Sequence, residues 1–71
     1  MKGFSYLVDS KATRICEAYA KRKKITIDEA MKIFLGSATY RVLNDIKTGV
    51  YLEVVEFVYD MFLEEMGEVL D

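Results

Sequence analysis

The sequence predicts an all-α protein: four short helices in a compact bundle, after an N-terminal segment that is irregular or briefly extended. Apolar residues recur every three or four positions through most of the chain, which is the spacing of one face of a helix. The chain contains no proline, so the strongest helix breaker is missing from these segments. Gly36 and Gly49 fall between periodic segments, and we expect them to divide the helices.

The length of 71 residues predicts a single helical domain over residues 1–71. A chain this short buries only about 60% of the surface that its unfolded form exposes, and small domains therefore often add a disulfide, a metal or a partner subunit. Cys16 is the single cysteine and histidine is absent, so we expect no intrachain disulfide, no metal and no cofactor. A partner is the remaining source of added stability, either another protein or a second copy in a homodimer.

The composition favours a cytoplasmic protein. One thiol without a disulfide framework is typical of a reducing compartment, and no signal peptide is recognised. No apolar run reaches the 18 or so residues that would indicate a membrane span. The net charge is −2, but residues 1–35 sum to 8 − 4 = +4 and residues 36–71 to 2 − 8 = −6. This asymmetry favours pairing between helices or head-to-tail association.

The first helix is expected over residues 10–23. Asp9 or Ser10 can cap its N-terminus by accepting a hydrogen bond from the backbone one turn on. The four consecutive cations at residues 21–24 suit the negative end of a helix dipole. The apolar face of this helix consists of Val8, Ala12, Ile15, Cys16 and Tyr19.

The second helix is expected to start at Thr26, because Thr26 and Glu29 have the spacing of a capping box. Its apolar face consists of Ile27, Ala30, Met31, Phe34 and Leu35. We expect Gly36 to end this helix in a left-handed conformation and Ser37 to cap a third helix over residues 38–46. A single rod is the alternative, because glycine costs a helix only about 1 kcal/mol relative to alanine. The third helix is expected to bury Thr39, Val42, Leu43 and Ile46.

The fourth helix is expected over residues 51–66, after a turn at residues 47–49. Its core face consists of Tyr51, Val54, Val55, Val58, Met61, Phe62 and Met66. A second apolar stripe of Leu52, Tyr59, Leu63 and Leu70 lies beside that face, and an acidic strip of Glu53, Glu56, Asp60 and Glu64 lies opposite. A stripe left uncovered by the bundle marks an interaction surface. The predicted partner-binding residues are Leu52, Glu56, Tyr59, Asp60, Leu63 and Leu70.

No catalytic residue is predicted, and we expect the chain not to be an enzyme. Histidine, the most common general acid or base, is absent, and Cys16 on an apolar helical face is typical of a small buried hydrophobe. The acidic strip has three interpretations: a solvated face or one paired with the first helix, a site for a basic partner, or a weak divalent-cation site. The basic cluster in the first helix is either a solvated helix end or a phosphate-binding patch.

Residues 25–65, more than half of the chain, resemble a family of small bacterial proteins that has no agreed biochemical role. The shared order is an Asp-Glu-Ala helix start, a Ser-x-Thr-Tyr-x-x-Leu segment, a Thr-Gly-x-Tyr turn and an amphipathic last helix. These pieces occur here at residues 28–30, 37–43, 48–51 and 57–65. Some similar proteins are encoded beside a proposed toxin of ADP-ribosyltransferase type, and the resemblance therefore implies an antitoxin-like role. The family has a small polar residue near position 54, whereas this chain has Val54, which weakens the predicted start of the fourth helix.

A second resemblance is to ribbon-helix-helix antitoxins and repressors, with residues 4–9 as the strand and residues 26–35 as the second helix. In that fold the strands of two chains pair in the DNA major groove, and alternate side chains read bases. Residues 4–9 carry no Arg, Lys, Asn or Gln, which are the usual base-reading types. A DNA-binding dimer is therefore the alternative. The favoured prediction is a small protein–protein interaction module, with nucleic acid and membrane not expected as partners.

Overall fold

The computed structural model describes residues 2–68 and confirms the all-α class, with no strand in that part of the chain. Two single 3₁₀ turns, η1 and η2, lie between the third and fourth α-helices. The elements in chain order are α1 (Lys2–Lys23), α2 (Ile27–Leu35), α3 (Ala38–Leu43), η1 (Ile46–Thr48), η2 (Val50–Leu52) and α4 (Val55–Glu65).

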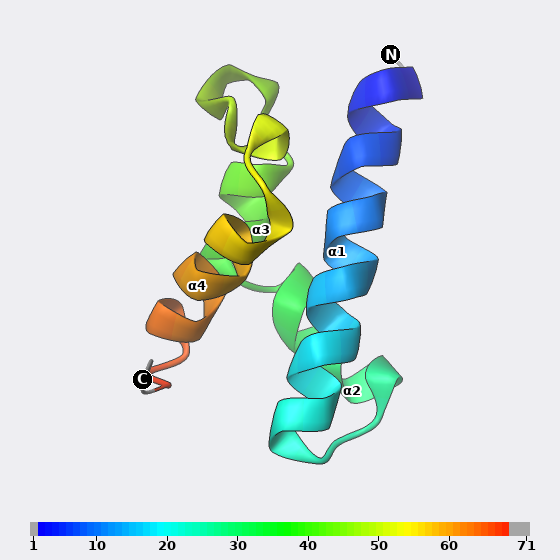
Figure 1. The fold of residues 1–71 in the computed structure, drawn as a ribbon, viewed down its shortest axis with the longest axis vertical. Helices are drawn as coiled ribbons and strands as arrows, with labels where there is room; N and C mark the ends of the chain where they lie inside the picture. The colour runs from blue at the N-terminus through cyan, green and yellow to red at the C-terminus, as the bar shows by residue number, and fades with distance from the viewer. Residues whose placement is uncertain (1, 69–71) are drawn as a thin grey trace.

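Helix α1 sets the length of the molecule. Its 22 residues span about 33 Å at 1.5 Å per residue, and the longest dimension of the chain is 34 Å. Figure 1 shows α1 standing beside a second layer made of α3, the two 3₁₀ turns and α4. Helix α2 packs against α1 and contacts α3, so it connects the two layers.

The predicted irregular or extended start of the chain is wrong, because α1 begins at Lys2 rather than near Ser10. Phe4 and Val8 extend the apolar face of the helix by two turns toward its N-terminus. Val8 is buried, and the ring of Phe4 lies edge-on to Tyr51 of η2 at 4.8 Å between centroids. Packing against η2 thus stabilises helical turns that the local sequence leaves undecided. The strand expected for a ribbon-helix-helix dimer is therefore not formed.

Four aromatic rings, one from each α-helix, form a continuous row through the core. The ring centroids of Tyr19 and Phe62 are 4.8 Å apart, those of Phe62 and Phe34 are 5.0 Å apart, and those of Phe34 and Tyr40 are 5.6 Å apart. All three pairs are edge-to-face, the geometry in which the ring quadrupoles attract. The predicted burial of the α1 face around Ile15, Cys16 and Tyr19 is confirmed.

Helices α2 and α3 are separate, and Ser37 separates them. Its hydroxyl donates to the carbonyl of Phe34 at 2.6 Å and accepts from the N–H of Tyr40 at 3.1 Å, so one side chain serves the end of one helix and the start of the next. The capping box of Thr26 and Glu29 is confirmed. The left-handed conformation predicted for Gly36 is wrong, because its φ is −91°.

The third and fourth helices are both shorter than predicted. Helix α3 ends at Leu43, and Ile46, expected in the core, is 48% exposed on η1. Helix α4 begins at Val55 rather than Tyr51, because Tyr51 belongs to η2 and the backbone is extended at Glu53 and Val54. Gly49, between the two 3₁₀ turns, takes a left-handed conformation with φ of 71°. Val54 lies at the N-cap, outside the helix and 65% exposed, and not in the core as predicted.

Helices α1 and α4 end in the same way. Lys24 and Gly67 have positive φ, and the next residue donates back to the carbonyls of Ala20 and Leu63 respectively. This is the Schellman pattern, which satisfies carbonyls at the end of a helix. Glu68 then forms ion pairs with the cations that end α1, at 2.8 Å to Lys23 and 3.3 Å to Arg22. The predicted pairing of the basic and acidic parts of the chain is thus present at this point.

Replacement of Phe34 tests the aromatic row. We expect Phe34→Ala to lower the free energy of unfolding by about 3–5 kcal/mol, the cost of deleting a buried phenylalanine ring. Ile33→Ala is the matched control, because Ile33 is 40% exposed, and it should cost about 1 kcal/mol or less. Urea unfolding followed by circular dichroism measures both. Equal midpoints for the two variants would contradict the central position of Phe34.

Two glycines test the helical start and the turn. No atom lies within 4 Å of a Cβ built at Gly3 or at Gly49, so neither substitution causes a clash. Gly3→Ala should raise the free energy of unfolding by up to about 1 kcal/mol, because Gly3 is helical. Gly49→Ala should lower it by about 1–2 kcal/mol, because its φ is positive. A loss of stability in Gly3→Ala would show that this residue is not helical.

Candidate protein-interaction surface

The structure separates the six residues predicted to bind a partner. Leu63 is 3% exposed and belongs to the hydrophobic core, so its prediction as an uncovered residue is wrong. Of the second stripe, Leu63 lies in the core and Tyr59 packs against it, and α1 contacts α4. Tyr59 is half-buried, and Leu52 is 68% exposed on η2 instead of on α4. Glu56 and Asp60 are exposed, and Leu70 lies outside the described residues.

A shallow groove runs between α1 and α4, and two of the predicted residues line it. It consists of two adjoining hollows of about 260 and 190 Å³ that share Arg14, Val55 and Glu56. Ser10, Lys11 and Val54 complete the first hollow, and Ile15, Ala18 and Tyr59 complete the second. The lining combines the apolar side chains of Ile15 and Val55 with the charged side chains of Lys11, Arg14 and Glu56. We call this feature the α1/α4 groove.

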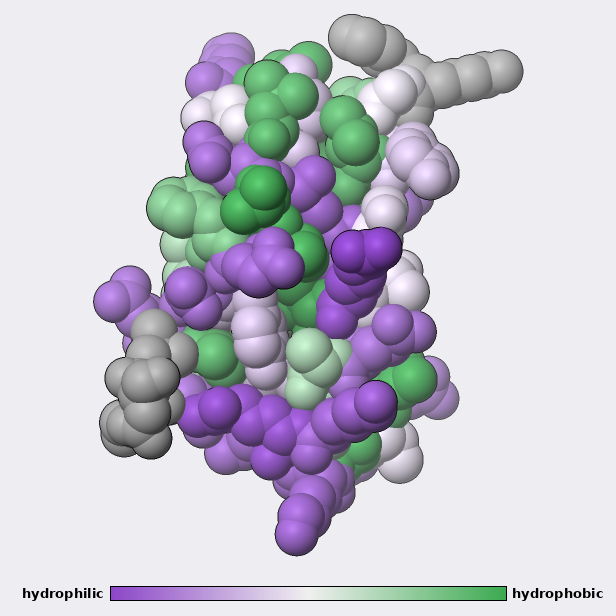
Figure 2. All heavy atoms as spheres, viewed as in Figure 1, coloured by the Kyte–Doolittle hydropathy of each residue, from purple (hydrophilic) through white to green (hydrophobic). Residues whose placement is uncertain are grey.

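Exposed apolar side chains surround the start of α4, at one end of this groove. Leu52, Val54 and Phe57 are 68%, 65% and 48% exposed. Figure 2 shows hydrophobic atoms gathered over η2 and the beginning of α4, whereas the half of that face near the end of α1 is mostly hydrophilic. Uncovered apolar area concentrated in one place is typical of an interaction surface. These three residues are the apolar shoulder of α4.

The charges around the groove are unpaired among residues 2–68. No ion pair joins Arg14 or Lys11 to Glu56 in that part of the chain, although all three line the groove. The first turn of α4 has no side-chain cap, because Val54 occupies the N-cap position. The positive end of the helix dipole therefore adds to the two cations. The hollow at this end of the groove is thus lined by two cations and one carboxylate, Glu56.

The acidic strip forms an exposed face. Its four carboxylates, Glu53, Glu56, Asp60 and Glu64, are all exposed. Within the described residues no cation lies at ion-pair distance from any of them. The predicted alternative in which the strip pairs with α1 is therefore wrong, since the pairing uses Glu68 instead.

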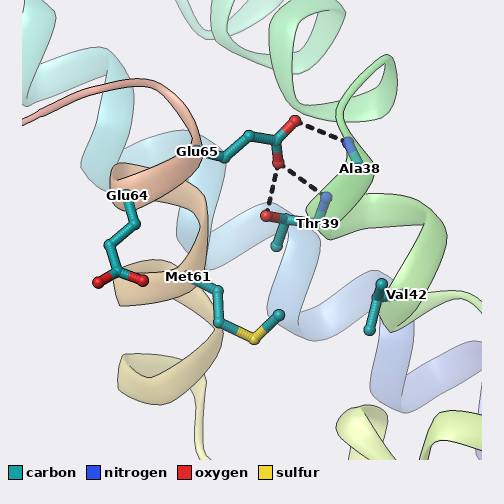
Figure 3. A pocket seen from close by; sticks show the side chains of 6 residues that line it. All are labelled: Ala38, Thr39, Val42, Met61, Glu64 and Glu65. Carbon is teal, nitrogen blue, oxygen red and sulfur yellow. Dashed lines mark hydrogen bonds between the residues drawn. The ribbon is translucent and has the colours of Figure 1, made fainter.

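Glu65 has a structural role that the sequence analysis missed. Its carboxylate accepts from the backbone N–H of Ala38 at 2.8 Å, and from the N–H and hydroxyl of Thr39 at 2.8 and 2.7 Å (Figure 3). A carboxylate at this position satisfies two free donors at the start of α3. Nothing in the sequence distinguishes Glu65 from Glu64, because the contact joins residues 26 and 27 positions apart.

The same contact lowers the pKa of Glu65. Partial desolvation raises the pKa, but the hydrogen bonds from the Thr39 hydroxyl and from the two backbone N–H groups outweigh it, with help from Arg41. The carboxylate stands at one side of a hollow of about 390 Å³ between α3 and α4, lined also by Val42 and Met61. Because its oxygens are engaged with α3, this hollow presents Glu64 as its open acidic group.

Cys16 is 1% exposed, and burial, followed by the charge of Glu17, raises the pKa of its thiol. A reactive cysteine instead needs a lowered pKa and access to solvent. The interpretation of Cys16 as a buried hydrophobe is confirmed by its place in the core. No group of three His, Cys, Asp or Glu side chains suited to a metal ion is found among the described residues.

A search of residues 2–68 finds no helix with the length and hydropathy needed to cross a membrane. Comparison of the chain with protein-family models, with curated proteins and with solved structures finds no match.

The hydrogen bonds of Glu65 predict a pH dependence. Since its pKa is lower in the folded state than the ordinary value of 4.5, the charged form stabilises the fold at neutral pH. This contribution is lost as the pH falls through the folded pKa. Glu65→Gln should therefore lower the free energy of unfolding by about 0.5–2 kcal/mol at pH 7, the range for removing a helix cap. As the pH falls below 4.5, this variant should lose less additional stability than the parent.

Glu64→Gln is the matched control for this measurement, because the described structure gives Glu64 no hydrogen bond. Urea unfolding at a series of pH values should give this control and the parent parallel profiles. If the free energy of unfolding of Glu65→Gln falls with acid in parallel with that of the parent and of Glu64→Gln, Glu65 does not cap α3.

Proposed function

We propose that the chain is a protein-binding module and that its partner occupies the α1/α4 groove and the apolar shoulder of α4. The observation that carries this proposal is the exposure of Leu52, Val54 and Phe57 at one end of a partly apolar groove. A soluble surface can expose single apolar side chains without consequence. Three large ones within six residues, next to a hollow, favour a contact that removes them from water.

The dimensions of the groove favour a helical segment as the ligand. Its α1 wall is formed by Lys11, Arg14 and Ala18, which follow the i, i+3, i+7 spacing of one helix face. From Lys11 to Ala18 the helix rises about 10 Å, which accommodates about two turns of a partner helix. Binding of an amphipathic helix in a groove between helices is a recurring mode of recognition.

The charges of the groove favour a partner with an acidic group beside its apolar face. Lys11 and Arg14 stand on the α1 wall, and the uncapped start of α4 faces the same hollow. A carboxylate placed there gains charge-assisted hydrogen bonds. Glu56 on the opposite wall selects against a second acidic residue on that side. The apolar contacts would supply affinity, and the charges would set orientation.

A photoreactive amino acid at position 54 tests the proposal inside cells. Val54 lines the groove and is 65% exposed, so a cross-linker there should capture the bound protein. Ile33 is the matched control position, because it is also β-branched and 40% exposed but belongs to α2. We expect a discrete cross-linked species from position 54 that is missing from position 33, and mass spectrometry then identifies it.

A second variant links the cross-link to the charges of the groove. Arg14→Glu should reduce the yield at position 54 several-fold while circular dichroism stays unchanged, because Arg14 is exposed. The absence of any cross-linked species at position 54, or equal species at both positions, would rule out the groove as the binding surface.

A further inference from the structure

Helix α2 carries an apolar ridge that its own chain does not cover. Ile27, Met31 and Leu35 are 49%, 41% and 46% exposed, whereas Ala30 and Phe34 on the neighbouring row are fully buried. The three exposed residues are spaced by four, so they form one ridge along the helix. The sequence placed all five residues on one apolar face, and the bundle buries only half of it.

The ridge is held rigidly before any partner binds. The N-terminus of α2 is fixed by the capping box, in which Glu29 N–H donates to Thr26 at 3.1 Å and Thr26 N–H donates to Glu29 at 3.0 Å. Its C-terminus is fixed by Ser37, and its inner side by Ala30 and Phe34, which are both fully buried in the core. A preformed ridge loses little conformational entropy on association. Ridges of i±4 spacing form the most common type of helix–helix packing, in which two such ridges interdigitate.

A row of opposite charges accompanies the ridge on its open side. Asp28 follows Ile27 and Lys32 follows Met31, so each charge lies about 100° around the helix from a ridge residue, on the side away from Phe34. Both side chains are exposed, and neither has an ion-pair partner within residues 2–68. The row therefore offers one negative and one positive charge, one helical turn apart, to whatever covers the ridge.

We infer that a second copy of this chain covers the ridge, with the two α2 helices antiparallel and related by a two-fold axis at the level of residue 30. With a rise of about 1.5 Å per residue, Ile27 lies about 4.5 Å below this level, Met31 about 1.5 Å above it and Leu35 about 7.5 Å above it. The two-fold axis inverts these heights for the second copy. The six ridge side chains then alternate between the copies every 3 Å or so, so that no ridge side chain stands level with one of the other copy.

The same register pairs the charges. Asp28 lies about 3 Å below the axis and Lys32 about 3 Å above it, so Asp28 of each copy stands level with Lys32 of the other. In an antiparallel pair related by a two-fold axis, the side of one helix that carries Asp28 and Lys32 lies beside the same side of the other helix. Two Asp28–Lys32 contacts therefore form. Both contacts lie close to the two-fold axis. At that point a crossing angle between the two helices changes the distance between them least.

The other interdigitating antiparallel register has its axis at the level of residue 32. It sets Lys32 of one copy level with Lys32 of the other and moves the two Asp28 side chains about 12 Å apart. Like charges at such a contact are unfavourable. Charge thus selects the register at residue 30, and this complementarity of the ridge with itself is the reason to assign a second copy as its occupant.

Sedimentation equilibrium of the full chain tests the dimer. The parent should show a monomer–dimer equilibrium, and Met31→Glu should raise the dissociation constant at least tenfold, because it places a charge in the centre of the ridge. Ile33→Glu is the matched control, since Ile33 is equally exposed but lies off the ridge, and its constant should stay within threefold of the parent's. Circular dichroism verifies that each variant folds.

Charge reversal and cysteine pairs test the register. Asp28→Lys and Lys32→Asp should each weaken the dimer, and the double variant should restore it. An oxidised mixture of Asp28→Cys and Lys32→Cys chains should form the mixed disulfide in preference to either homodimer, against a low background because Cys16 is buried. Predominant Lys32→Cys homodimers would indicate the rejected register and overturn this assignment.

Two further outcomes would overturn the inference. One is a parent chain that remains monomeric at concentrations up to about 1 mM, where a contact with a dissociation constant of about 1 mM is half saturated. The other is a dimer whose constant does not respond to Met31→Glu. The inference does not rest on the α1/α4 groove, and Phe57→Ser should leave the dimer intact. Loss of the dimer in Phe57→Ser but not in Met31→Glu would place the self-association at the apolar shoulder instead.

Discussion

The row of four aromatic rings is the contact on which the rest of the structure depends. Phe34 touches Tyr40 and Phe62, and Phe62 touches Tyr19, so a single network joins all four α-helices. Phe34 and Phe62 are the largest of the fully buried side chains in the described residues, and each edge-to-face pair contributes about 0.5–1.5 kcal/mol beyond its buried area. The row fixes the rotation of α2 and α4 about their axes. It thereby decides which of their apolar residues face inward and which remain exposed.

Both candidate surfaces follow from this rotation. Because Phe34 and Ala30 point into the core, the ridge of Ile27, Met31 and Leu35 lies beside the core and faces away from it. Because Phe62 and Val58 point into the core, Val55 and Tyr59 are turned toward α1 and line the groove. A domain with more than half of its residues apolar has more apolar surface than four short helices can enclose. The packing decides only where the excess lies.

The polar contacts act at the ends of the helices and set their lengths. Ser37 and Glu65 satisfy donors at the start of α3, and Glu68 joins the end of α4 to the end of α1. Ser37 is recognisable in the sequence, because a cap acts on a residue three positions away. Glu65 and Glu68 are not recognisable, because their partners lie 26 or more positions away. Local rules predicted the first kind of contact and had no means to predict the second.

The sequence by itself determined the all-helical class, the capping box at Thr26, the cap at Ser37 and the inward face of α1, because each depends on residues within about two helical turns. It could not determine that residues 2–9 are helical, that Leu63 is covered by its own chain or that the uncovered ridge lies on α2. Those features depend on the neighbour that each segment meets: η2 for Phe4, the hydrophobic core for Leu63, and the aromatic row for α2. A helix with a wide apolar arc has several ways to bury part of it, and only the tertiary contacts choose among them.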